Sequence, residues 1–122
     1  MTKIYKTNTR HFKVFQEHVR HWVDSLSLNE WKVCIEHLVL DADCYGDILT
    51  DCKGRCCVIR LNHNWDEPAT NAKLKSTARH EALELLIADS YGLWRGTERQ
   101  RIIVGHAIIR RLEHVFDKAG ML

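Results

Sequence analysis

Residues 31–61, WKVCIEHLVLDADCYGDILTDCKGRCCVIRL, decide the fold class, because their hydrophobic residues follow a two-residue period. Apolar and polar residues alternate over 31–35 and again over 57–61. Gly46 and Gly54 mark turns between the apolar runs. The pattern predicts a three-stranded, mostly antiparallel meander.

The segment before these strands has the period of a helix. Between Thr9 and Leu26, apolar residues recur at spacings of three and four, which predicts an amphipathic helix. Asn8 or Thr9 can cap its start.

Two more helices are predicted after the strands, over 71–91 and 99–118, and a loop over 63–70 leads into the first of them. Thr97 and Gln100 have capping-box spacing, and Gly120 stands where a helix-ending glycine is expected. A short connection makes the two helices an antiparallel pair. The predicted fold is α+β, in the order α-β-β-β-α-α.

Length and composition indicate a single globular domain over residues 1–122. The chain is 45% hydrophobic and 28% charged, close to globular averages. Its net charge of +2 is too small to indicate a nucleic-acid or membrane partner. The arginines between Arg95 and Arg111 are typical of a solvated helix face.

The cysteine pattern favours free thiols. The chain has five cysteines, an odd number, and its first residues lack the apolar core of a secretory signal. Cys56 and Cys57 would face opposite sides of a strand, and no Cys-x-x-Cys spacing supports a cysteine metal site. We therefore expect reduced cysteines and a cytoplasmic protein.

His80, Glu81 and Glu84 form the most informative motif for chemistry. Residues four apart share a helix face, so His80 and Glu84 can point at a common ion. Imidazole and carboxylate are both zinc ligands. Glu81 then stands where a general base would be needed. The alternative is that the three residues are the polar side of an amphipathic helix.

The whole arrangement resembles the zincin metallopeptidases, and most closely the very small zincin-like metallopeptidases of bacteriophages. The resemblance rests on Trp31-Lys32-Val33, on His80-Glu81, and on a final helix containing His106 and the run Arg111-Leu112-Glu113. In the family, the metal helix carries His-Glu-x-x-His. Here the second histidine is replaced by Glu84, which can either ligate the metal in its place or mark a site that has lost it.

The resemblance implies a zinc metallopeptidase that hydrolyses peptide bonds with a metal-bound water, in the host cytoplasm if phage-encoded. His80, Glu84 and His106 would bind zinc, and Glu81 would be the catalytic base. Its partner would be a peptide or protein substrate, pairing with an exposed edge of the strands. The alternative is an inactive zincin-like scaffold that binds and inhibits a host protein, for example a defence protein.

The third ligand can be weighed by helix geometry. A helix rises about 1.5 Å per residue. By this measure, the distance from His80 to the end of the helix over 71–91 is about equal to the distance from the start of the helix over 99–118 to His106. Glu98 lies at the very start of that last helix. This favours His106 over Glu98. A histidine among isoleucines is equally typical of a hydrogen-bonded core residue, and that alternative stays open.

Overall fold

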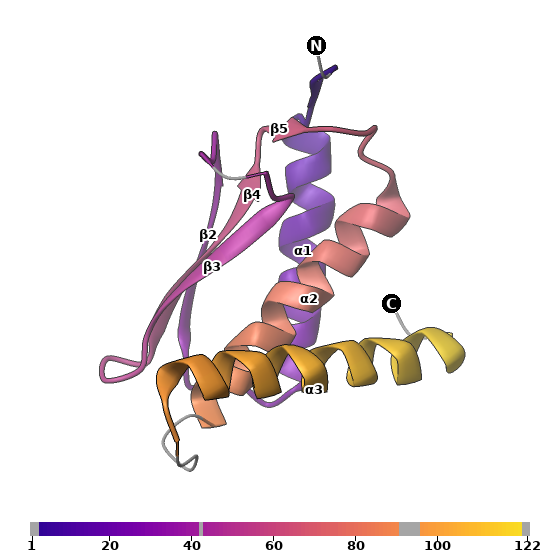
Figure 1. Cartoon of the computed structure of the whole chain (residues 1–122). Coiled ribbons are helices and arrows are strands. Elements are labelled where there is room, and N and C mark those ends of the chain that lie inside the picture. The colour runs from indigo at the N-terminus through magenta and orange to yellow at the C-terminus, as the bar shows by residue number, and fades with distance from the viewer. Residues whose placement is uncertain (1–2, 42, 91–95, 121–122) are drawn as a thin grey trace.

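The computed structural model describes residues 3–41, 43–90 and 96–120. Within these residues, three helices and five strands follow one another (Figure 1). They are β1 (Tyr5–Lys6), α1 (Thr9–Ser25), β2 (Lys32–Leu38), β3 (Gly46–Asp51), β4 (Cys56–Asn62), β5 (Asn64–Trp65), α2 (Asn71–Ser90) and α3 (Glu98–Lys118). The α+β class and the predicted order of the main elements are confirmed. Tyr91, the predicted last residue of α2, lies outside the described residues.

The strand order differs from a meander. Strand β4 lies in the centre of the order β2-β4-β3, antiparallel to β3 and parallel to β2. Ile59 and Leu61 of β4 are fully buried, so this most apolar strand takes the position where both of its edges are hydrogen-bonded. Alternation along the chain identifies the strands and their inward faces, but it does not determine which strand lies in the middle.

The predicted loop over 63–70 contains a short strand. Strand β5 pairs antiparallel with β1, and Tyr5 lies opposite Trp65. Trp65 is almost completely buried and donates from Nε1 to the carbonyl of Tyr45 at 3.2 Å. Two of the three strand pairs in the chain's described part are thus antiparallel.

The helix ends follow the sequence signals. The Asn8 side chain, one of the two predicted caps, accepts from the His11 amide at 2.9 Å, and His11 Nδ1 accepts from the Asn8 amide at 3.0 Å. At α3, the Thr97 hydroxyl accepts from the Gln100 amide at 3.1 Å. Gly120 has a positive φ of 71°, as a helix-ending glycine should.

Helix α2 lies at the centre of the molecule and is buried on several sides. Figure 1 shows α1 behind it, the sheet beside it and α3 crossing it. Its residues Leu74, Ala78 and Leu85 join the core formed by α1 and the sheet, while Leu83 and Ile87 pack against Ile109 of α3. None of the described helices is both long and apolar enough to cross a membrane.

Strand β3 approaches α2 closely at its first residue. A Cβ on Gly46 would lie 2.7 Å from the carbonyl oxygen of Arg60 and 3.3 Å from Thr77 Cγ2. Only glycine fits this space without a shift of the backbone. The sheet edge therefore lies beside the helix that carries His80.

Candidate metal centre

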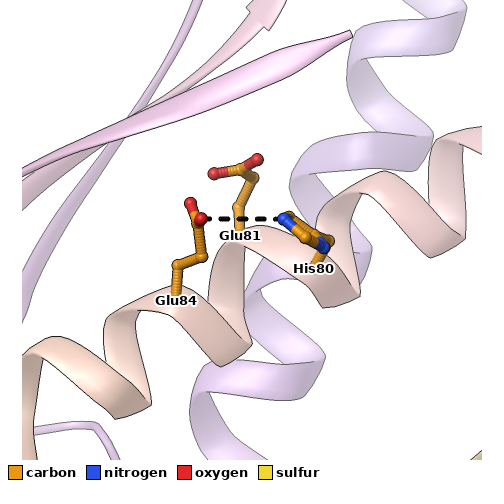
Figure 2. A group of neighbouring side chains, drawn as sticks. All are labelled: His80, Glu81 and Glu84. Atoms are coloured by element: carbon orange, nitrogen blue, oxygen red, sulfur yellow. Dashed lines mark ion pairs between the residues drawn. The ribbon is translucent and has the colours of Figure 1, made fainter. Parts of the chain in front are cut away.

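His80, Glu81 and Glu84 project from the same side of α2 (Figure 2). One potential ligand atom from each of the three lies within 4.8 Å of the others, a grouping that could hold a metal ion. His80 Nε2 is 3.6 Å from Glu84 Oε1, an ion pair across one helical turn. The local spacing predicted from sequence therefore brings these three groups together.

Helix α3 brings two more site residues to the same place. His106 Nε2 lies 3.3 Å from Glu84 Oε1. His80 Nδ1 lies 3.4 Å from both carboxylate oxygens of Glu113. Arg79 also pairs with Asp117 at 2.9 Å. As the residue numbers rise along α2, those of the partners on α3 fall, so the two helices are antiparallel.

His106 is not a core histidine. Its side chain is 56% exposed, whereas that of Glu84, its partner, is 25% exposed. His106 pairs with Glu84, whereas the residue of α3 that pairs with His80 is Glu113. His106 therefore lies at the open side of the group, where a solvent-accessible ligand would stand.

Glu113 is the site residue that the sequence reasoning assigned no role. It lies seven residues after His106, and two turns of a helix bring both onto one face. This spacing alone indicates that Glu113 and His106 share a helix face. What the sequence did not provide was the register of α3 against α2, which sets Glu113 opposite His80.

The pKa of His80 follows from the three carboxyl groups around it. The hydrogen bond to Glu84 raises the pKa of His80 to about 9, against the opposing effect of burial, and Glu81 and Glu113 add to the rise. Without a metal, the imidazolium therefore donates from Nε2 towards Glu84 and from Nδ1 towards Glu113.

The two glutamates of the motif differ in charge state. Burial, reinforced by the charge of Glu84, raises the pKa of Glu81 to about 9. Burial alone would also raise the pKa of Glu84, but hydrogen bonds with His80 and Glu81 lower it overall. One carboxyl is therefore held neutral and the other ionised, a split that is common at functional sites.

Glu81 also has an unsatisfied atom. The residue is only 4% exposed, and its Oε2 is buried with no hydrogen-bond partner among the described residues. A buried oxygen without a partner usually marks an ordered water, a bound ion or a functional role. It lies beside a cleft of about 320 Å³, lined by Cys44, Tyr45, Gly46, Ser76, Thr77, His80, Glu81 and Glu113.

The spacing of Glu84 from each of the two histidines suits a metal ion, but the residues whose ligand atoms all lie within 4.8 Å of one another are His80, Glu81 and Glu84, and His106 does not belong to this group. Two ligand atoms bound at 2.0–2.1 Å in a tetrahedral zinc site are about 3.3 Å apart. The separations of Glu84 Oε1 from the His106 and His80 nitrogens, 3.3 and 3.6 Å, are close to that value. Imidazole and carboxylate donors suit several divalent metals, so the geometry does not choose among them.

Comparison with models of known protein families gives no match, and comparisons with curated proteins and with solved structures give no significant match. The candidate metal centre therefore stands on the geometry of these residues.

Proposed function

We propose that the chain is a minimal zinc-dependent peptidase of the zincin type. His80 and Glu84 of α2 and His106 of α3 would hold the zinc ion, and Glu81 would act as general base. The observation that carries the proposal is the convergence of His80, Glu81 and Glu84 beside an open cleft.

The proposed ligand set combines two imidazoles and one carboxylate, as in many zinc peptidases. A zinc ion held there would act as a Lewis acid and lower the pKa of a bound water. The positive charge would also favour the carboxylate form of Glu81, which sits one residue from a ligand and can then accept a proton from the attacking water.

Glu113 would orient His80 for this role. With its Nδ1–H donated to the Glu113 carboxylate, the imidazole presents Nε2 on the side of Glu84. Metal-ligating histidines commonly donate their second N–H to a carboxylate in this way, which fixes the tautomer and the ring orientation.

The sheet offers a place for a peptide substrate. Strand β3 is an edge strand, and its first residue, Gly46, lines the cleft with His80 and Glu81. An extended peptide that adds to this edge by backbone hydrogen bonds would pass beside the proposed zinc ligands.

The first test is the metal content of protein purified without chelator. We expect about one zinc ion per chain, and a large loss in His80→Ala. Less than a tenth of an equivalent, even after zinc is added back, would reject the metal centre.

The second test is Glu81→Gln in the zinc-loaded protein. The variant should keep its zinc and lose nearly all peptidase turnover, because it lacks the base but no proposed ligand. Unchanged turnover would reject the role of Glu81. Wild-type protein that binds zinc and cleaves no peptide would favour the inactive scaffold that binds a host protein.

A further inference from the structure

Helix α3 exposes apolar side chains next to the candidate metal centre. Ile102 and Ile103 are 43% and 59% exposed. Among the 21 residues of α3, only Gly105 and Ile109 are buried. Branched apolar side chains in such positions lose contact with water when a partner covers them, so their exposure favours a binding surface.

Helical spacing assigns part of this surface to the face that bears His106. Ile102 and Ile103 precede His106 by four and three residues, and Arg110 follows it by four. Residues at these spacings are neighbours on a helix. Because His106 contacts Glu84, this face of α3 borders the proposed zinc ligands.

The same face has positive charge without a partner. Arg110 is exposed, and so is Arg99, which lies seven residues before His106. Neither forms an ion pair within the described ranges 3–41, 43–90 and 96–120. Glu84 and Glu113, the carboxylates that contact the two histidines, are already engaged by them.

We propose that this face of α3, defined by Arg99, Ile102, Ile103 and Arg110, binds the substrate of the proposed peptidase. The inference rests on that proposed function and names the substrate class: polypeptides with acidic residues next to large apolar ones, close to the cleaved bond. The apolar residues would cover Ile102 and Ile103, and the acidic ones would pair with the arginines.

Two other occupants fit this face less well. A symmetric pair of chains joined through it would bring two positively charged faces together, and like charges at an interface are unfavourable. Nucleic-acid phosphates would pair with the arginines but would leave the isoleucines without a role. An acidic and apolar polypeptide uses both kinds of side chain.

The test is cleavage of a degenerate peptide library by the zinc-loaded wild-type protein, with products identified by mass spectrometry. We expect Asp or Glu beside Leu, Ile, Val or Phe to be enriched around the cleaved bonds. Cleavage without this enrichment would overturn the substrate class and leave the peptidase proposal standing. No cleavage of any library member would instead count against the peptidase itself.

Variants locate the surface. For a peptide selected from the library, Arg110→Gln should lower kcat/KM about two- to fivefold, and Ile103→Ser about tenfold. The matched controls Arg111→Gln and Val104→Ser lie five and two residues from His106, on other sides of the helix, and should change it little. Equal losses in variants and controls would reject this face as the binding surface.

A binding experiment separates recognition from catalysis. The zinc-loaded Glu81→Gln protein is immobilised and exposed to the same library and to a single-stranded oligonucleotide. Selective retention of acidic and apolar peptides, lost in Ile103→Ser, supports the surface even if the wild type does not cleave them. Retention of the oligonucleotide in preference to the peptides would overturn the proposal.

Discussion

The imidazole of His80 lies between two carboxylates that approach its two nitrogens from different helices. Glu84 comes from the same helix and faces Nε2, while Glu113 comes from α3 and faces Nδ1. Since only Nε2 is directed to the group of proposed ligands, Glu113 would act through His80 and not on the metal directly.

Removal of Glu113 should therefore weaken metal binding without removing a ligand. We expect Glu113→Ala to lower zinc affinity about 10- to 100-fold, as is usual for the carboxylate partner of a ligating histidine. Glu113→Gln, which keeps an acceptor, should lose less. Competition with a chromophoric chelator measures both. Wild-type affinity in the alanine variant would show that α2 alone orients His80.

The raised pKa of Glu81 makes a prediction about stability and pH. The folded, metal-free protein holds this proton up to a pKa of about 9, whereas the unfolded chain releases it near the ordinary value of 4.5. The folded state binds more protons between these values, so the free energy of unfolding should fall as pH rises from 5 to 9. The raised pKa of His80 acts in the same direction.

The contribution of Glu81 can be isolated with Glu81→Gln. Because one pKa unit corresponds to about 1.4 kcal/mol, the wild type should lose at least about 1–2 kcal/mol more than the variant over this range. Urea unfolding at pH 5, 7 and 9 with chelator present gives the comparison. If both proteins lose the same free energy, Glu81 is ionised in the folded state.

At the scale of elements, the packing of α2 against α3 determines which residues of the two helices meet. Glu84 faces His106 and His80 faces Glu113, so each residue of the predicted His80–Glu84 pair has its own partner on α3. Glu98 stands in the first turn of α3, two turns before His106. The helix-length argument favoured His106 over Glu98, and His106 does reach Glu84. It placed His106 at the level of His80, however, and that position is taken by Glu113.

This register makes His106 and Glu98 a matched pair for mutation. We expect His106→Ala to weaken zinc binding strongly, because it removes a proposed ligand. Glu98→Ala should leave the affinity nearly unchanged. Zinc titration monitored by calorimetry distinguishes the two variants. A loss in Glu98→Ala but not in His106→Ala would mean that α3 sits in a different register when the metal is bound.

The hydrophobic periodicity of the sequence was enough to predict the helices and strands, but not which of them lie side by side. The helix over 9–25 and the pair His80 and Glu84 depend on spacings within one element, which a sequence displays directly. The central position of β4 and the approach of Glu113 to His80 depend on contacts between elements. Neither has a local signal, and both depend on how the core packs.

At the scale of the whole molecule, two apolar clusters hold the described elements together. The larger joins α1, α2 and the sheet, and the smaller joins α2 to α3 through Leu83, Ile87 and Ile109. Helix α2 belongs to both. The helix that carries His80 is therefore anchored on both sides. Helix α3, attached through the smaller cluster, carries four of the eight exposed large apolar side chains among the described residues: Ile102, Ile103, Val104 and Val115.

The five cysteines report on this packing, because they differ in burial. All five are free; Cys34 and Cys52 are exposed, and Cys57 is buried in the larger cluster. Burial raises the pKa of Cys57 to about 11, so little of its thiol is in the reactive thiolate form near neutral pH.

Thiol labelling should therefore separate the surface from the core. In the native protein we expect Cys34 and Cys52 to react first. Cys57 should react about 10³-fold more slowly or slower still, because exposing it requires opening a core worth at least about 5 kcal/mol. In denaturant all five should react alike. Mass spectrometry of alkylated peptides assigns each rate to its residue. If Cys57 reacts as fast as Cys34 in the native protein, β4 is not held in the core as described. A cysteine that stays unreactive in denaturant would reveal a disulfide.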